Sequence, residues 1–406
     1  MLQEEKINNT QDFSEKFSHL QRSALQNTLI ELRNPENLSF GLGLPNTKLF
    51  PSESFSKIGQ ELLNERKYFQ YESPSLDLKK MIVKIMEKRG VECNENQILL
   101  THGAQQGVSL LVNLLLSNQG TVVSEEIIFT EFLQTIKPYN TKLISVPSTD
   151  AEGIDVDALE DLLSNGLQPS LLYTISNGHN PLGINLSFEK KKKLALLAKK
   201  YSFPIIEDDP YGFLNYDGTD HSPLRSFEND WIFYVGSFSK ILAPSLRTGW
   251  VVAPENIIDK LDILKDSSDL NTSTLSQHLI SKYLKENDIF EHIDKINEEY
   301  SALRNTMVRA INSHFPSSIE FEIPSNGMFI WVRLPNEVNS LDLLKLTLSE
   351  VKVAFLPGEV FCATNPLIAK NCIRLNFTNF SHDQIETGIE LLGSTIKKYI
   401  KDLKSL

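Results

Sequence analysis

Short apolar runs rich in β-branched residues recur through the middle of the chain, and segments of helical length separate them. Between several runs the apolar positions repeat with helical spacing, as in AQQGVSLLVNLLL and EKKKKLALLAKKY, which predicts amphipathic helices. Strands that alternate with helices in this way favour a mostly parallel sheet with helices on both faces. The predicted strands are the runs at 97–101, 121–125, 142–147, 171–176, 204–208, 231–238 and 249–254.

The pattern changes at both ends of the chain. Residues 12–33 carry apolar side chains at helical spacing, and the glycines and prolines of 40–51 then predict a loop. After about residue 285, a long helical stretch at 288–314 precedes short apolar runs and an amphipathic helix at 382–403. We therefore expect three parts, namely an N-terminal arm and loop over 1–51, a large α/β domain over 52–285 and a smaller α+β domain over 286–406.

Composition and charge narrow the classes of function. Of the 406 residues, 41% are hydrophobic and 23% are charged, which is typical of a globular protein with a substantial core. The net charge of −12 disfavours nucleic acid or an anionic membrane as a partner, and the basic run at 190–193 is expected to be a solvated helix face. Cys93, Cys362 and Cys372 are too widely spaced to predict a disulfide framework or a metal site.

The sequence gives no sign of export or of membrane insertion. Its first residues, MLQEEKINNTQDFSEKF, are polar and acidic, where a signal peptide would be basic and then apolar. Its apolar runs are all shorter than the roughly 18 residues that a membrane-spanning helix needs. We therefore expect a cytoplasmic protein.

Candidate chemistry follows the predicted strands directly, at the edge where parallel sheets bind their ligands. After 97–101, Gly103 and Ala104 open a helix whose backbone N–H groups suit an anion. Asn180 lies in an Asn-Pro turn after another strand, while Asp208 ends a strand and precedes Tyr211. Each feature alone also has a structural explanation, because glycines open helices for packing, Asn-Pro forms ordinary turns and acids cap helices.

The stretch SFSKILAPSLRTGW at 237–250 is the most specific signal. Ser237, Ser239 and Arg247 surround Lys240 in the sequence and supply donors suited to a phosphate dianion. Pyridoxal phosphate requires a lysine amine, an acid for its pyridine nitrogen, donors for its phenolate oxygen and a cradle for its phosphate. Because the strand ends supply all four, we predict that Lys240 is a nucleophile and that pyridoxal 5′-phosphate is the cofactor.

These segments resemble those of the class I/II aminotransferases of fold type I, most closely the branch of 2-aminoadipate and aromatic aminotransferases. From about residue 23 onward the resemblance is carried by GLPNTKLFP, LLTHGAQQG, HNPLG, IEDDPYG and the lysine segment, then by PSNGMFIWVRLP, FLPGEVF and CIRLNFT. It implies a large domain with a seven-stranded mostly parallel sheet between helices, plus a smaller α+β domain. It also implies transfer of an amino group from an L-amino acid to a 2-oxo acid through a Schiff base on Lys240.

The resemblance assigns roles residue by residue. It implies that Lys240, Asp208 and Tyr211 are catalytic, with Lys240 moving the proton at the substrate Cα and Asp208 pairing with the pyridinium. Asn180 joins Tyr211 at the phenolate oxygen. The remaining cofactor contacts that it implies are an aromatic stacked on the ring, Phe129, and the phosphate-binding residues Gly103, Ala104, Gln105, Ser237, Ser239, Arg247 and Tyr71.

The resemblance also implies the substrate contacts and the partner. Arg374 is expected to clamp the substrate α-carboxylate in a bidentate fork, with Gly43 and Asn180 lining that site. Tyr71 falls where relatives reach into the phosphate site of the neighbouring subunit, which implies a homodimer with active sites at the interface. The N-terminal arm is expected to complete the small domain and to cover the active site.

Several positions depart from the family pattern. Ile127 stands where relatives have a proline, Leu182 replaces the threonine of the Asn-Pro turn, and 71–79 is shorter than in relatives. Gln26 stands where aminoadipate-type relatives often have an arginine, which disfavours an acidic amino donor. Two alternatives therefore stay open. One is another reaction on the same cofactor, such as oxygen-dependent oxidation, elimination or decarboxylation, and the other is a ligand-sensing module, although the sequence shows no DNA-binding segment.

Overall fold

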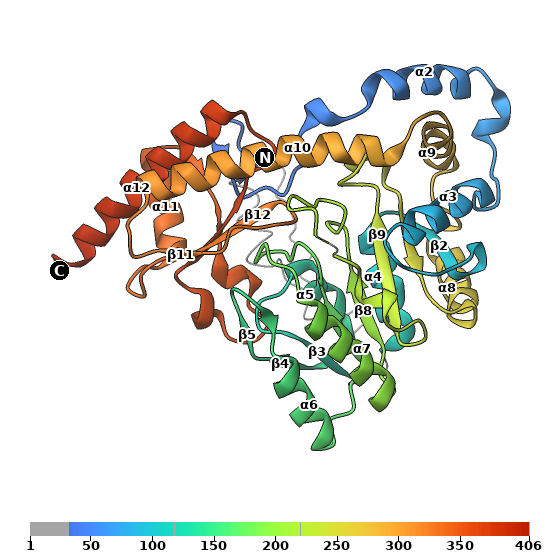
Figure 1. The fold of residues 1–406 in the computed structure, drawn as a ribbon, viewed down its shortest axis with the longest axis horizontal. Helices are drawn as coiled ribbons and strands as arrows, with labels where there is room; N and C mark the ends of the chain where they lie inside the picture. Colours follow the sequence, from blue (N-terminus) through green and yellow to red (C-terminus); the bar gives the residue numbers. More distant parts are fainter. Residues whose placement is uncertain (1–31, 117–118, 220, 406) are drawn as a thin grey trace, which may run out of the picture.

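The computed structural model describes residues 32–116, 119–219 and 221–405, and Figure 1 shows its ribbon. Gln26 and nearly all of the helix predicted at 12–33 lie outside these residues. Within the described ranges, no helix is long and apolar enough to cross a membrane.

The seven predicted strands form one sheet. Its strands lie in the order β2 (Ile98–Thr101), β10 (Gly249–Val252), β9 (Ile232–Ser237), β8 (Ile205–Asp208), β7 (Leu171–Thr174), β3 (Thr121–Glu125) and β4 (Lys142–Val146). β10 runs antiparallel to β2 and β9, whereas β9, β8, β7, β3 and β4 pair in parallel. The prediction of a mostly parallel sheet is therefore confirmed, and the central strands are buried on both faces, as their continuous apolar runs indicate.

Helices cover both faces of this sheet (Figure 1). One face packs against α4 (Ala104–Leu115), α5 (Thr130–Ile136) and α8 (Glu255–Asp269), through alternate strand side chains such as Tyr173 and Phe233. Over one half of the other face lie α6 (Val156–Ser164) and α7 (Phe188–Tyr201). Over its other half lie α2 (Ser52–Leu63), α3 (Leu76–Glu87) and α9 (Thr274–Glu286).

A second, antiparallel sheet follows in the C-terminal part of the chain. Its strands lie in the order β11 (Glu320–Phe321), β12 (Phe329–Arg333), β15 (Cys372–Asn376) and β14 (Leu356–Pro357). The helices of this part are α10 (Ile289–His314), α11 (Ser340–Glu350) and α12 (His382–Leu403), and α10 and α12 run side by side (Figure 1). β1 (Leu38–Ser39) pairs in parallel with β13 (Val353–Ala354), which brings the start of the described chain into this part.

The core continues from the large sheet into the small one. A single cluster of buried apolar side chains extends from α4 and α5 to β12 and β15, and it includes Tyr211, Phe329 and Phe361. A short hairpin of β5 (Ser148–Thr149) and β6 (Gly153–Ile154) completes the strands. The small sheet is therefore packed firmly against the strand ends that carry the predicted chemistry.

Candidate active site

The carboxyl ends of β7, β8 and β9 lie next to one another in the large sheet. The parallel register pairs Thr174 with Glu207 and Asp208 with Val235, so the residues after each strand emerge at one edge. Asp208 ends β8, and Lys240 follows the end of β9 by three residues. The topology therefore brings together side chains that are far apart in the sequence.

Lys240 is half-buried at this edge. Its Nζ donates a hydrogen bond of 3.0 Å to the carbonyl oxygen of Gly43 and lies 5.9 Å from the centre of the Tyr211 ring. Burial, with smaller contributions from the positive charges of Arg374 and Arg247, lowers the pKa of Lys240 from 10.5 to about 8. Near pH 8 a large fraction of the amine is therefore neutral, which is the form that acts as a nucleophile.

Asp208 is 5% exposed and has one oxygen engaged. Its Oδ2 accepts a hydrogen bond of 2.7 Å from the hydroxyl of Tyr173, a donor that the sequence analysis did not identify. Its Oδ1 is buried without a hydrogen-bond partner among the described residues. Burial raises the pKa of Asp208 to about 7, although the bond from Tyr173 acts in the opposite direction. A buried oxygen of this kind suits a protonated ring nitrogen.

The acids on either side of Asp208 have their own partners. Glu207 accepts hydrogen bonds from the backbone N–H groups of Leu224 and Arg225. Asp209 forms an ion pair of 2.7 Å with Arg89, which is nearly buried. Both acids therefore have partners on their carboxylates, whereas Asp208 keeps one buried oxygen without a partner among the described residues. Arg89 was also missed in the sequence, where it reads as the exposed end of a helix.

Arg374, Asn180 and Tyr211 form a chain of hydrogen bonds. Nη1 of Arg374 donates to Oδ1 of Asn180 at 2.6 Å, and Nδ2 of Asn180 donates to the hydroxyl oxygen of Tyr211 at 3.4 Å. The Asn180–Pro181 peptide is cis. Burial raises the pKa of Tyr211 well above its ordinary value, so the hydroxyl keeps its proton and can donate.

Arg374 is 4% exposed and enclosed by aromatic rings. Its guanidinium lies 4.1 Å from the centre of the Phe329 ring and 5.0 Å from that of Phe361, and Nη2 donates to the carbonyl oxygen of Gly41 at 2.7 Å. Its Nε is buried with no partner in the described part of the chain. Burial lowers the pKa of Arg374 to about 10, so it stays cationic at neutral pH and can bind a carboxylate.

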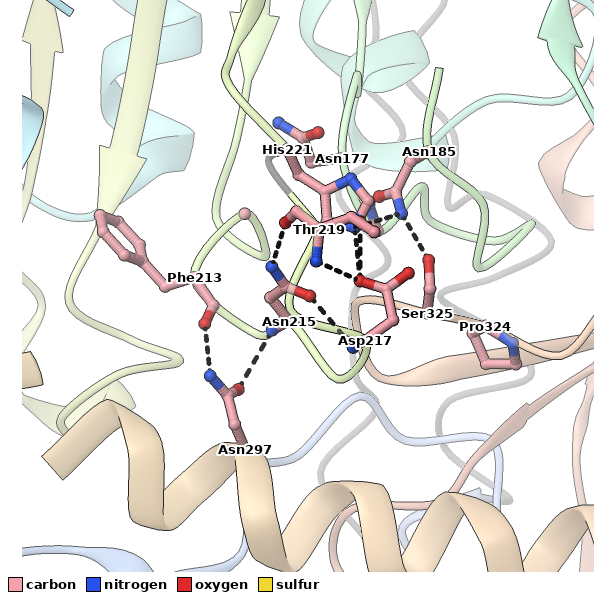
Figure 2. Close-up of polar contacts among 12 residues, drawn as sticks. Asn177, Asn185, Phe213, Asn215, Asp217, Thr219, His221, Asn297, Pro324 and Ser325 are labelled. Atoms are coloured by element: carbon pink, nitrogen blue, oxygen red, sulfur yellow. Dashed lines mark hydrogen bonds and ion pairs between the residues drawn. The ribbon is translucent and has the colours of Figure 1, made fainter. Parts of the chain in front are cut away.

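The segment that carries Asn180 is held by polar contacts, and Figure 2 shows those of Asn185 together with a neighbouring network from Phe213 to His221. Asn185 accepts a hydrogen bond of 2.7 Å from the backbone N–H of Gly178 and donates one of 2.9 Å to Ser325. From α10, Asn297 donates to the carbonyl oxygen of Phe213 at 3.1 Å (Figure 2). The two bonds of Asn185 join the ends of the turn that carries Asn180 to each other and to the segment between β11 and β12, which restrains Asn180.

Lys191 corrects one expectation from the sequence. The basic run at 190–193 was expected to face solvent, but Lys191 is 3% exposed. Its Nζ donates 2.6 Å to Oδ1 of Asn177, whose Nδ2 donates in turn to Asp209 at 3.2 Å. A hydrogen-bonded path therefore leads from α7 to the acids at the end of β8, which explains why the helix buries one of its lysines.

The predicted phosphate site lies where β2 turns into α4. Gly103 is the N-cap of α4 with φ of +77°, and a Cβ there would lie 2.5 Å from Nη2 of Arg247. Only glycine therefore lets the arginine approach the first turn of the helix. The hydroxyls of Ser237 and Ser239 lie 2.9 Å apart at the end of β9. The guanidinium and the N–H groups at the start of α4, with Ala104 as its first residue, suit an anion.

Three other predicted residues are placed differently. The side-chain amide of Gln105 donates to the hydroxyl of Thr135 at 2.9 Å, and its backbone N–H lies in the first turn of α4. Phe129 is the N-cap of α5 and packs against the core. Tyr71 is 83% exposed and lies on the surface of this chain. The cofactor contacts of Gln105, Phe129 and Tyr71 stay predictions.

The residues present fit pyridoxal phosphate. Oδ1 of Asp208 offers a buried acceptor for its pyridinium, and the Gly103–Arg247 approach leaves a positive cradle for its phosphate. Asn180 and Tyr211 offer donors for its phenolate oxygen. The amine of Lys240 lies near Tyr211, at the same carboxyl edge of the large sheet. The donor set matches the separate chemical needs of the ring, the phenolate and the phosphate.

Known proteins resemble this chain over nearly its whole length. The family model for aminotransferase class I and II matches residues 37–392. An aromatic-amino-acid aminotransferase 1 from Thermococcus litoralis is 33% identical, over 96% of this chain and 95% of its own length. A 2-aminoadipate transaminase from Thermus thermophilus is 30% identical, over 95% and 96%. The crystal structure of a kynurenine aminotransferase from Pyrococcus horikoshii, in complex with PMP, aligns with a TM-score of 0.89 at 33% identity, covering 96% of this chain and 98% of that one.

Proposed function

The chain belongs to the class I and II aminotransferases, and on that premise we propose that Lys240 carries out its chemistry. The protein is a pyridoxal-phosphate-dependent aminotransferase, which moves an amino group between an amino acid and a 2-oxo acid. The observation that supports the proposal is the Nζ of Lys240, whose pKa is lowered to about 8 and which lies over the Tyr211 ring beside the strand end of Asp208.

The proposed cofactor contacts follow from the donor set. When bound, pyridoxal phosphate supplies an electron sink for the bonds of the substrate Cα. Oδ1 of Asp208 would accept from the pyridinium, and Asn180 and Tyr211 would donate to the phenolate oxygen. The other proposed contacts are Phe129 on the ring and, around the phosphate, Gly103, Ala104, Gln105, Ser237, Ser239, Arg247 and Tyr71 of the neighbouring subunit.

In this proposal Lys240 also moves the proton. With the cofactor held by Asp208, Asn180 and Tyr211 and supplying the electron sink, the amine of Lys240 would accept the proton from the substrate Cα and release it again within the site. A pKa of about 8 suits both steps, because the amine then takes up and releases a proton readily near neutral pH. Arg374 holds the substrate α-carboxylate with Asn180 and Gly43 beside it, which fixes the direction in which the Cα–H bond points.

We also propose that the protein is a homodimer and that Tyr71 completes the partner's phosphate site. Three large side chains close together in the sequence are exposed on this chain, with Leu63 56%, Phe69 63% and Tyr71 83% exposed. Such a group favours burial against a second copy. The domain boundaries that we propose are those from the sequence, 52–285 for the large domain and 286–406 for the small one, which the arm and loop over 1–51 complete.

The direct test replaces Lys240 by alanine. We expect wild-type protein to transfer an amino group from an amino acid to a 2-oxo acid, and Lys240→Ala to lose at least a thousandfold in kcat, since it lacks both nucleophile and base. Lys192→Ala, an exposed change on α7, serves as the matched control and is expected to keep wild-type kcat. Full turnover by Lys240→Ala would contradict the proposal.

A further inference from the structure

Glu131 is a half-buried carboxylate near the site with no role in the proposed contacts to the cofactor or to the substrate α-carboxylate. It lies in the first turn of α5, two residues after Phe129. Its side chain is half-buried, and Oε2 is buried without a hydrogen-bond partner within the described ranges. A carboxylate oxygen left in this state is costly unless a ligand supplies a donor or a cation.

Two sets of contacts fix the first turn of α5 between the predicted cofactor and substrate sites. On one side the backbone N–H of Ile128 donates to the carbonyl oxygen of Phe361 at 2.8 Å, and Phe361 lies over Arg374. On the other side Phe132 stacks on Tyr173, with ring centres 3.9 Å apart, and Tyr173 is the residue that donates to Asp208. Glu131 precedes Phe132, so it belongs to a turn that reaches both anchors.

The charge of Glu131 interacts with those of Arg374, Tyr211 and Tyr173. Burial raises its pKa, while its own backbone N–H and then the positive charge of Arg374 act in the opposite direction. The carboxylate in turn contributes to the raised pKa of Tyr211 and of Tyr173, after the larger effects of burial and of nearer groups. Its field therefore reaches the groups that bind the substrate carboxylate and the cofactor.

When each charge of the cofactor and of the substrate backbone is paired with a residue of the site, no positive charge is left to pair with Glu131. In the proposed complex the phosphate pairs with Arg247, the pyridinium with Asp208 and the substrate α-carboxylate with Arg374. Among the described residues of the site, Glu131 then remains as a carboxylate with an unpartnered oxygen, and Arg374, the cation whose charge acts on it, is committed to the substrate. A positive charge on the substrate side chain would balance it.

We propose that Glu131 makes the enzyme prefer amino donors with a cationic side chain, such as diamino or guanidino acids. The inference rests on the proposed function, because it takes Arg374 as the α-carboxylate clamp. With the α-carboxylate on Arg374, the side-chain cation pairs with Oε2 of Glu131. A donor with an acidic side chain is repelled by the same carboxylate.

The first experiment compares donors that differ only in the terminal charge. L-ornithine and L-norvaline share a five-carbon chain, and only ornithine has the second ammonium group. In wild-type enzyme we expect kcat/KM for ornithine to exceed that for norvaline at least tenfold. In Glu131→Gln we expect kcat/KM for ornithine to fall tenfold to a hundredfold, with norvaline changed less than about twofold. Glu126→Gln is the matched control, since its Oε2 accepts from the backbone N–H of Ser148, and it should change neither value.

A second readout measures binding without turnover. α-Methyl-L-ornithine and α-methyl-L-norvaline lack the Cα proton, so their dissociation constants are obtained by absorbance titration of the holoenzyme. We expect wild-type enzyme to bind the ornithine analogue at least tenfold more tightly, and Glu131→Gln to bind the two about equally. This readout distinguishes the inference from the proposed function, because it does not require amino transfer.

Several results would overturn the inference. One is wild-type enzyme that binds the norvaline analogue as tightly as the ornithine analogue. Another is a Glu131→Gln enzyme that loses norvaline and ornithine turnover equally, which would give Glu131 a structural or cofactor role. Activity with neutral donors alone would also reject it while leaving the proposed function intact. If Glu131→Gln does not fold, the wild-type comparison of the two analogues still decides the question.

Discussion

Tyr173 donates a hydrogen bond of 2.7 Å to Asp208, and the two side chains come from neighbouring strands, β7 and β8. The bond engages Oδ2 and leaves Oδ1 without a partner among the described residues, and Oδ1 is the oxygen that we propose accepts from the ring nitrogen. It also lowers the pKa of Asp208 against the larger, opposing effect of burial. We therefore expect Tyr173 to act as a positioning residue, which works through Asp208 without touching the substrate.

We expect Tyr173→Phe to weaken catalysis in a pH-dependent way. Without the hydrogen bond the pKa of Asp208 rises above about 7, so less of the carboxylate is charged at neutral pH. The acidic limb of the kcat/KM profile should move to higher pH, with kcat at pH 7 reduced about tenfold and partly regained at pH 9. Tyr399→Phe, on α12, is the control. A uniform loss at every pH would instead indicate a packing role for Tyr173.

Asp208→Asn is expected to stabilise the cofactor-free protein, increasingly so at higher pH. The pKa of Asp208 is about 7 in the folded protein and near 3.8 when unfolded, so the unfolded chain gives up its proton first. Wild-type stability therefore falls as pH rises from about 4 to 7, and the variant lacks this loss. Between pH 5 and 8 its advantage in the free energy of unfolding should grow by about 3 kcal/mol. Urea denaturation at both pH values measures it, and a constant difference would contradict the shifted pKa.

Much of the fold and part of the site could be predicted from the sequence because they rest on local patterns. The seven apolar runs are the seven strands of the large sheet, since strands buried on both faces read as continuous apolar segments. Lys240 and Asp208 could be proposed because they directly follow or end such strands, and ligands bind at that edge.

The missed residues depend on which strands and helices become neighbours. Tyr173 reads as one more apolar residue of its strand until β7 and β8 pair and their side chains meet. Arg89 and Asp209 are 120 positions apart, and no periodicity links them. Lys191 lies in a lysine-rich helix that predicts exposure, yet its side chain is buried and donates a hydrogen bond to Asn177. Glu131 also could not be identified from the sequence, because only the packing of its segment against Phe361 and Tyr173 brings it near the site.

Arg374→Lys should raise KM for both substrates. The guanidinium is held by Asn180 and Gly41 and offers Nε, whereas an ammonium cannot form a fork to a carboxylate. We expect KM for the amino acid and for the oxo acid to rise tenfold to a hundredfold, since both carry the same carboxylate. The affinity for pyridoxal phosphate should stay unchanged. Arg333→Lys is the matched control, because Arg333 lies in the same sheet but pairs with Asp150. An effect on cofactor affinity alone would contradict the assignment.

Mixing two defective variants would test the shared site of the proposed dimer. In a hybrid of Lys240→Ala with Tyr71→Ala, one site combines the intact Lys240 of one subunit with the intact Tyr71 of the other. We expect the purified hybrid to regain about half of the wild-type activity at limiting pyridoxal phosphate, where Tyr71→Ala alone binds the cofactor weakly and Lys240→Ala alone is inactive. Tyr71 is 83% exposed on a single chain, so its side chain is free to contact a second subunit. A hybrid no more active than Tyr71→Ala, or a monomer in sedimentation, would show that each chain builds its site alone.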